Sequence, residues 1–494
     1  IGMRTLQTNT TGASNTAVGI QALLSNTTAS FNTAVGQNAL VANTTGTENT
    51  AVGALAGDAI TTGSHNTAVG YIALSAATTA SDNSAFGREA LRDCTSGNSN
   101  TAIGQEALKL NTTGVENTAV GHHSLNANTT GQQNTALGRL ALLLNTTGAF
   151  NVGIGSATLD ANTTGSNNTG IGTGALTANT TASNNTGIGH SSLAANTTGA
   201  ENTALGFGAL ASNTTAASNV AVGFKSMLVN TTGTANTGLG ESTLRANTTA
   251  SNNTAVGFSA LTSDTTGEQN TAVGDTCGDA ITTANFFTGI GRGAGGAITT
   301  GTSNTMLGYF AGNHSHGTTT GDENTIIGSL SRASSATQSN AVVVGYNVEG
   351  TGNFTTVGNG TSEIRAAHGN ITWATVSDER VKKDIEDSTV GLNFINDLRP
   401  VTFNYKNKGD LPTEFRGYEE DSTEVYKSEK SQHGFIAQEV KAAIDKHSDI
   451  KNGFSMWDDN DETGQQRVGE TALIPMLTKA VQELSAKVEE LESK

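Results

Sequence analysis

Small apolar residues and polar residues follow one seventeen-residue pattern over the first two-thirds of the chain. The repeating unit is N-T-A-V-G-x-x-A-L-x-x-N-T-T-G-x-x, and its first glycine recurs at every seventeenth position from Gly19 to Gly308. A fixed period in this range is typical of a solenoid, in which each repeat is one turn of chain stacked on the next. The sequence therefore predicts a mainly β structure, built as a β-solenoid or β-roll.

The apolar positions of the repeat predict what fills the interior of each turn. The segments Ala17-Val18-Gly19 and Ala22-Leu23 predict two short strands per turn. We expect the Val18 position and the Leu23 position to form two inward ladders of side chains. The asparagine at Asn15 repeats in successive turns without interruption as far as Asn270, and stacked asparagines pair their amides along such a column. The sequence thus predicts an asparagine ladder beside a narrow apolar core.

The repeat loses its regularity towards the C-terminus, and the composition changes with it. The step from Gly308 to Gly328 is longer than the regular period, and the step from Gly345 to Gly358 is shorter. All three prolines and most of the charged residues follow residue 376. We therefore predict a repeat shaft over 1–345, a transition neck over 346–376, and a small α+β domain over 377–494.

The last helix expected in this domain has a regular apolar face. Its apolar residues follow a 4-3-4-3 spacing, which is a heptad seam; they are Leu477, Val481, Leu484, Val488 and Leu491. About two heptads are too few for a stable isolated coiled coil. We expect a coiled-coil-like helix that buttresses the C-terminal domain, and the alternative is an ordinary amphipathic core helix.

Four sequence runs in the C-terminal domain occur in a characteristic order. They are S-D-E-R-V-K-K-D-I (377–385), L-R-P-V-T-F-N-Y (398–405), H-G-F-I-A-Q-E-V (433–440) and A-L-I-P-M-L-T-K-A-V-Q-E-L (472–484). Together they resemble the intramolecular chaperone domain of the peptidase S74 family, which ends phage tail fibres, tailspikes and endosialidases. The repeats over 15–345 resemble the β-roll heads of trimeric autotransporter adhesins in their core pentad.

The resemblance to peptidase S74 implies a self-cleaving site. It makes Ser377 the nucleophile and Lys382 its base, with a single cut between Val376 and Ser377 and no activity on external substrates. A lysine acts as a base only when desolvation or a nearby cation lowers its pKa. Arg380 and Lys383 are the candidate cations, and Asp378 is a further supporting residue.

The spacing of the two catalytic candidates constrains their local structure. On one α-helix, side chains five residues apart point about 140° away from each other. The Ser377–Lys382 pair therefore needs a turn, or a lysine from a neighbouring subunit. The alternative interpretation of this segment is that Ser377 and Asp378 cap the start of a helix.

A nearly perfect repeat raises a problem of register between chains. Sliding one shaft by a single repeat along a neighbour preserves almost every contact, so the repeat alone does not select one register. A unique trimeric domain at one end removes this ambiguity. The family resemblance implies a homotrimer whose C-terminal domain directs assembly, and the register argument explains why such a domain follows the repeat.

These observations predict a trimeric phage tail fibre or adhesin-like host-attachment shaft, carried on the virion. Its expected partner is a host surface receptor, a glycan or an outer-membrane component. The alternatives are a bacterial surface adhesin and a fibre-borne polysaccharide depolymerase whose catalytic domain lies in a missing N-terminal part. The net charge of −17 argues against nucleic acid as a partner.

Other ligands receive little support from the sequence. We expect no membrane insertion, because the chain contains no apolar run of about 18 residues. We expect no cofactor. His314 and His316 are a weak metal candidate, since residues two apart lie on one side of a strand. The alternative for these histidines is a polar loop.

Overall fold

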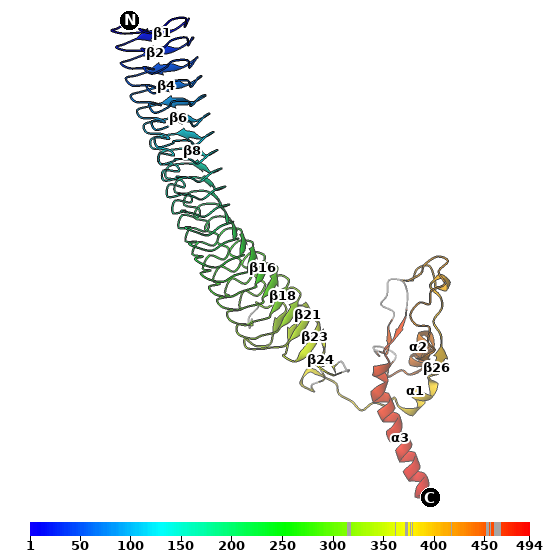
Figure 1. Cartoon of the computed structure of the whole chain (residues 1–494). Coiled ribbons are helices and arrows are strands. Elements are labelled where there is room, and N and C mark those ends of the chain that lie inside the picture. The colour runs from blue at the N-terminus through cyan, green and yellow to red at the C-terminus, as the bar shows by residue number, and fades with distance from the viewer. Residues whose placement is uncertain are drawn as a thin grey trace. The chain divides into compact units, whose positions relative to one another are not determined.

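The computed structural model describes residues 1–313, 318–360, 362–370, 374–375, 377, 379–415, 417–450, 454, 456–458 and 466–494. The chain forms two compact units, Ile1–Val376 and Ser377–Lys494. The first unit is a stack of similar coils that each carry one short strand, and the second contains the three α-helices (Figure 1).

The first unit contributes one strand from each coil to a single long sheet. The predicted β-solenoid is confirmed, but each coil from β1 to β18 contains one three-residue strand and not two. The strands are β1 (Thr16–Val18), β2 (Thr33–Val35), β3 (Thr50–Val52), β4 (Thr67–Val69), β5 (Ser84–Phe86), β6 (Thr101–Ile103), β7 (Thr118–Val120), β8 (Thr135–Leu137), β9 (Val152–Ile154), β10 (Thr169–Ile171), β11 (Thr186–Ile188), β12 (Thr203–Leu205), β13 (Val220–Val222), β14 (Thr237–Leu239), β15 (Thr254–Val256), β16 (Thr271–Val273), β17 (Thr288–Ile290), β18 (Thr305–Leu307) and β19 (Thr325–Ile327).

Successive strands pair in parallel and in register, so that equivalent residues stack. Thr16 lies opposite Thr33, and the same pairing recurs as far as β19 and β21 (Val342–Tyr346). β23 (Phe354–Asn359) continues the parallel stack, whereas β24 (Ser362–Ala367) and β25 (Ala374–Thr375) pair antiparallel. A small side ladder joins β20 (Arg332–Ala333) to β22 (Glu349–Gly350). The segment expected as a neck, 346–376, thus carries the last strands of the sheet.

The interior of each coil holds the middle residue of the strand together with the Ala-Leu pair. Ala34, Ala39 and Leu40 are fully buried, so the inward leucine ladder is confirmed. The expectation of an inward valine ladder is wrong, because Val18 is 39% exposed and Leu239, at the same position, is 47% exposed. In a three-residue strand the outer two side chains share one face, and the middle alanine alone points inward.

The expected second strand is replaced by a tight corner. Gln21 and Leu23 have φ angles of 60° and 50°, in the left-handed region that interrupts a strand. Equivalent residues of the other coils adopt the same conformation. This conformation is costly for leucine, and the complete burial of the Leu23 side chain offsets the cost.

The second unit is a small α+β structure around one apolar cluster. Its helices are α1 (Leu392–Asp397), α2 (Ala437–Lys446) and α3 (Ile474–Glu492), with short 3-10 helices η1 (Glu379–Val381), η2 (Lys408–Asp410) and η3 (Glu470–Leu473). Two antiparallel ladders join β26 (Val401–Phe403) to β27 (Gln432–Gly434) and β28 (Trp457–Asp458) to β29 (Arg467–Val468). Phe394, Val440, Ile444 and Met456 are among the residues at the centre of the cluster.

Two asparagine ladders connect neighbouring coils of the shaft. In the first ladder, which contains Asn15, the backbone N–H of Asn32 donates to Asn15 Oδ1 at 2.9 Å. The side-chain Nδ2 of Asn32 donates to the carbonyl oxygen of Gly46 at 2.9 Å. The predicted asparagine ladder is therefore confirmed, although the amide binds backbone groups as well as the next amide. Each ladder asparagine thus provides hydrogen-bond partners for backbone N–H and C=O groups at the corner just before the strand.

The second ladder contains Asn26 and joins the amides directly. Asn43 Nδ2 donates to Asn26 Oδ1 at 3.0 Å. Ile60 occupies this position in the following coil, and among the described residues Asn43 Oδ1 is buried without a hydrogen-bond partner. Substitution of one ladder residue therefore leaves an unsatisfied group on its neighbour.

Asp264 ends the longest run of the second ladder and is fully buried. It accepts hydrogen bonds from the Gly267 N–H at 2.8 Å and from Asn270 Nδ2 at 3.5 Å. An ionised carboxylate has no proton to give to Asn247 Oδ1, and that oxygen instead accepts the Ala250 N–H at 3.1 Å. Burial raises the pKa of the Asp264 carboxyl to about 7.

We expect Asp264→Asn to stabilise the shaft above pH 7 and to have little effect at pH 4. Because the pKa of Asp264 is higher in the folded than in the unfolded chain, its contribution to stability is lost as the pH rises from about 4 to about 7. The gain at pH 8 should be on the order of 2–4 kcal/mol. Thermal unfolding midpoints at both pH values, at one scan rate, measure it.

Glu241→Gln is the matched control, because Glu241 is an exposed acidic residue on the surface of the shaft. Its difference from the unsubstituted chain should not change between pH 4 and pH 8. An equal gain for Asp264→Asn at both pH values would show that the ionisation of this carboxyl is not the cause.

Candidate functional site

Ser377 and Lys382, the predicted nucleophile and base, lie in direct contact. Lys382 Nζ donates a hydrogen bond to Ser377 Oγ at 2.8 Å. Both residues belong to the same chain, so a single copy suffices to bring the hydroxyl and the amine together. This is the distance at which an amine can accept a proton from a hydroxyl once the amine is neutral.

A tight turn between the two residues produces this contact. The 3-10 helix η1 covers Glu379–Val381, and the Lys382 N–H donates to the Glu379 carbonyl oxygen at 3.0 Å. Of the two ways to form the pair, a turn or a neighbouring subunit, the structure shows the turn. The alternative that Ser377 and Asp378 cap an α-helix finds no support in the described residues, where the next α-helix begins at Leu392.

The other predicted site residues contribute less to the described geometry. Arg380 and Lys383 are both exposed beside the pair. Val376, Asp378, His314 and His316 lie outside the residues that the structure describes. Within the described part of the chain, no three histidine, cysteine or acidic side chains form a group that could hold a metal ion.

The surroundings of the pair in one chain are open to solvent. Ser377 and Lys382 are both exposed. Since a lysine acts as a base when desolvation disfavours its charged form, this pair requires that another surface cover it. The single chain thus supplies the geometry of a serine–lysine dyad without the desolvation that such a dyad uses.

The second and third sequence runs of the C-terminal unit come together around two strands. β26 carries the V-T-F of the second run, and β27 carries the H-G of the third, with Val401 opposite Gly434. Arg399 at the start of β26 forms an ion pair with Glu439 in α2. Hydrogen bonding to Arg399 lowers the pKa of the Glu439 carboxyl. Two runs that are distant in sequence are thereby joined by a sheet ladder and an ion pair.

Helix α3 packs against α1 through one face and leaves its heptad seam uncovered. Ala480 is buried, and Glu483 Oε2 accepts the backbone N–H of Leu392 at 2.9 Å. Glu483 thereby caps α1, since Gly391 at its start has no side chain for this role. Leu477, Val481, Leu484, Val488 and Leu491 are instead between 45% and 70% exposed. The helix therefore packs on the unit as expected, but through a face other than its heptad seam.

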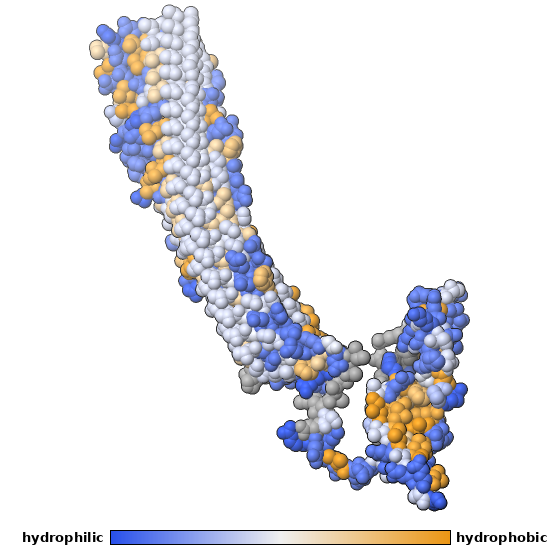
Figure 2. Space-filling model, turned by 60° about the horizontal axis from the view of Figure 1, so that its bottom comes forward, coloured by the Kyte–Doolittle hydropathy of each residue, from blue (hydrophilic) through white to orange (hydrophobic). Residues whose placement is uncertain are grey.

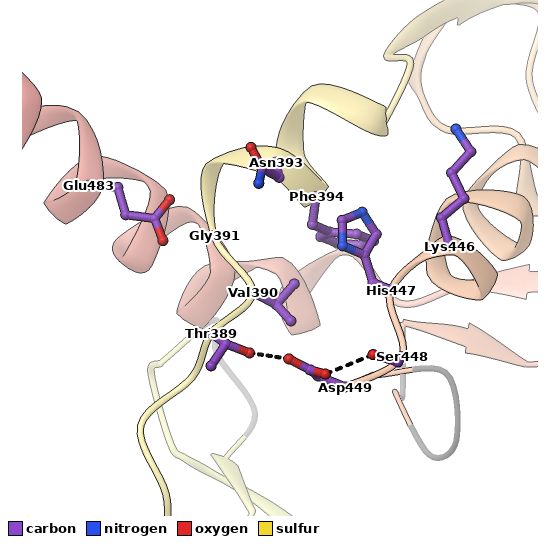
Figure 3. Close-up of a pocket in the computed structure, with 10 residues that line it drawn as sticks. All are labelled: Thr389, Val390, Gly391, Asn393, Phe394, Lys446, His447, Ser448, Asp449 and Glu483. Atoms are coloured by element: carbon purple, nitrogen blue, oxygen red, sulfur yellow. Dashed lines mark hydrogen bonds between the residues drawn. The ribbon is translucent and has the colours of Figure 1, made fainter.

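A cavity of about 180 Å³ lies where the segments flanking α1 and α2 approach α3 (Figure 3). Its polar groups are mostly paired with one another. Asp449 accepts hydrogen bonds from Thr389 and from Ser448, and His447 Nε2 lies 3.0 Å from Asp397 Oδ2. The hydrogen bond with His447 lowers the pKa of the Asp397 carboxyl. The arrangement fastens α1 to α2 rather than presenting free groups to a ligand.

This cluster and the cap from Glu483 were not predicted from the sequence. Asp397, His447 and Glu483 lie far apart in sequence and form no motif of fixed spacing.

The two units together define a class of proteins in which a repeat shaft is followed in the chain by a small α+β unit. In this chain the α+β unit begins with a serine–lysine pair. Residues 377–449 match the family model of the chaperone of endosialidase, peptidase S74. The C-terminal unit of this chain therefore carries a peptidase S74 chaperone domain. No curated protein matched the chain, and no solved structure matched it.

Among the described residues, no helix is both long enough and apolar enough to cross a bilayer.

We expect Glu483→Ala to loosen α1 without unfolding the shaft. Loss of the cap should cost about 1 kcal/mol in the C-terminal unit. Hydrogen–deuterium exchange over residues 389–398 should accelerate, while exchange in the shaft stays unchanged. Glu483→Gln keeps an acceptor and should have the smaller effect. Glu489→Ala, an exposed residue of the same helix, is the control, and equal exchange in all three variants would rule out the cap.

Proposed function

We propose that this chain is the shaft and C-terminal chaperone of a trimeric fibre that attaches a virion, most simply a tailed phage, to a host surface receptor. The observation that carries the proposal is the chaperone-of-endosialidase match over 377–449, directly after a β-solenoid of seventeen-residue coils. The C-terminal domain aligns three shafts and then separates itself from them by one cut between Val376 and Ser377.

Exposed apolar surface on the shaft supports association of several copies. The third residue of each strand forms an outward aliphatic column, in which Ile103 is 42% and Leu205 is 44% exposed. Figure 2 shows one face of the shaft, on which a column of residues of intermediate hydropathy is flanked by interspersed hydrophobic and hydrophilic residues. Monomeric proteins rarely expose an apolar surface of such length, and long exposed columns of this kind indicate an interaction surface.

The seam of α3 supports association at the other unit. A shallow apolar groove follows it, lined by Ile474, Leu477 and Val481 among others. Heptad seams with aliphatic residues at both core positions pack against copies of themselves in parallel bundles. A helix with a seam of only two heptads gains little stability alone. Its apolar seam residues become buried when the helices of three copies pack against one another.

The serine–lysine pair supports the cleavage step. Ser377 Oγ attacks the carbonyl carbon of the preceding peptide bond while neutral Lys382 Nζ takes the hydroxyl proton. That proton passes to the peptide nitrogen as the carbon–nitrogen bond breaks, which leaves an ester between residue 376 and Ser377. Water then hydrolyses the ester and releases fragments 1–376 and 377–494. Assembly supplies the burial that the exposed pair of a single chain does not have.

We expect Ser377→Ala and Lys382→Ala each to give trimers that remain uncut. The first substitution removes the nucleophile and the second removes its base, and neither side chain is buried in the fold. Lys382→Arg should also stay uncut, because a guanidinium keeps its charge but does not accept the proton. Intact-mass measurement of the purified protein distinguishes the full chain from the two fragments.

Lys430→Ala, another exposed lysine of the same unit, is the control and should be cut normally. Normal scission in Ser377→Ala or in Lys382→Ala would refute the assignment of the pair while leaving the trimeric shaft intact.

We expect Val481→Asp combined with Leu484→Asp to abolish trimer formation. These side chains are 65% and 47% exposed in one chain, so the substitutions should leave the fold of the unit intact. Three carboxylates per position would repel one another in a closed bundle. Analytical ultracentrifugation should report monomers or irregular aggregates. Ala486→Asp, on the opposite face of α3, should remain trimeric, and trimers from the seam variant would contradict the proposal.

A further inference from the structure

The outward face of the shaft sheet is nearly uniform, and one coil departs from it at two positions together. We call the first and third residues of strands β1–β19 the outer strand face. The first residue is threonine or valine and the third is aliphatic in every one of these strands except β5. In β5 the first residue is Ser84 and the third is Phe86, so the smallest and the largest side chain of the face occur in one coil.

Inside the shaft, the same kind of paired size change has a clear physical reason. A Cβ atom added to Gly170 would lie 2.7 Å from Thr158 Cγ2, and one added to Gly289 would lie 2.6 Å from Cys277 Sγ. Glycine thus replaces the usual inward alanine of the strand where an inward neighbour is larger. Because the interior is closed and densely packed, an enlarged residue at one position requires a reduced one beside it.

On the outer strand face, a single chain provides no such closed packing. Phe86 is 40% exposed, and its neighbours in the adjacent strands are Val69 and Ile103. The additional methyl group of a threonine at position 84 would project on the same outward face. One chain therefore gives no packing reason for a serine there. A second surface that closes over the face would give one.

We propose that the outer strand face is the contact between copies of this chain, and that Phe86 of one copy packs over Ser84 of its neighbour as a register key. This inference rests on the proposed trimeric shaft. Around a threefold axis, the contact between neighbouring copies is head-to-tail, so one position meets a different position of the next chain at the same level. When equivalent coils of neighbouring copies lie side by side, the large Phe86 ring of one copy packs over the small Ser84 of the next.

The key distinguishes the correct register from its nearest alternatives. A slip of one coil places Phe86 over Thr67 or Thr101 of the neighbour, where an additional methyl group occupies the space. All other coils make nearly the same contacts with the neighbouring copy before and after a slip of one coil. A second copy is the occupant indicated here, because the aliphatic column follows the whole shaft and the attached chaperone domain belongs to a trimer-forming family.

Self-sorting of two full-length chains tests the key. The first chain is unsubstituted, and the second carries the key one coil later through Ser84→Thr, Phe86→Val, Thr101→Ser and Ile103→Phe. Each chain alone should form trimers, since each key matches itself. Co-expressed with different affinity tags, the two should give at least about tenfold fewer mixed trimers than random assortment. Native mass spectrometry after tandem affinity purification counts the mixed species.

A matched control displaces an exposed apolar side chain elsewhere on the coil. Leu144→Ala with Ala161→Leu moves by one coil a side chain that is 47% exposed and lies in the corner after β8. This chain should mix randomly with the unsubstituted one. Random mixing of the displaced-key chain, or its failure to form trimers alone, would overturn the key while the unsubstituted trimer stands. Absence of trimers from the unsubstituted chain would overturn the proposed function itself.

Discussion

Every coil of the shaft depends on its neighbours for the hydrogen bonds of its corners. With three strand residues in a seventeen-residue coil, most backbone groups lie in turns, where buried N–H and C=O groups need partners. The neighbouring coil supplies them, through backbone bonds at each strand and through the two asparagine ladders. A coil is therefore stable only when the coils before and after it have the same shape, which accounts for the strictness of the repeat.

This dependence explains how much of the fold was predictable. A seventeen-residue period with a fixed asparagine indicated stacked coils, and the structure shows them. The direction of the apolar residues was not predictable from the pattern, because Ala17 and Val18 are both apolar and adjacent. Periodicity shows that they face opposite sides without showing which side is the interior. The narrow coil decides it, since the space across from Leu23 holds an alanine and leaves the bulkier valine outside.

The site shows a similar division between what the sequence predicts and what needs the structure. The run from Ser377 to Ile385 pointed to a serine–lysine pair, and its spacing required either a turn or a second subunit without deciding between them. The heptad of α3 was recognised, but the face through which the helix packs on the unit was not predicted. A seam shows that a helix has an apolar face, whereas only the packing of Ala480 and Glu483 shows that another face docks on α1. Contacts between distant segments, such as that between α1 and α2 in the polar cluster, leave no periodic trace in a sequence.

Three features of the single chain are incomplete in the same way. The outward aliphatic column and the α3 seam are apolar but uncovered, and the serine–lysine pair is aligned but solvated. On the proposed function, association completes all three, and cleavage then follows assembly because desolvation of Lys382 requires it. A register key in β5, close to the N-terminal end of the described shaft, fits this order. In the proposed trimer, the chaperone fixes the register at the C-terminal end. A coil that stacks incorrectly in one copy then shifts all coils farther from the chaperone relative to those of the neighbouring copies. A key far from the chaperone therefore detects accumulated errors that a key beside it would not.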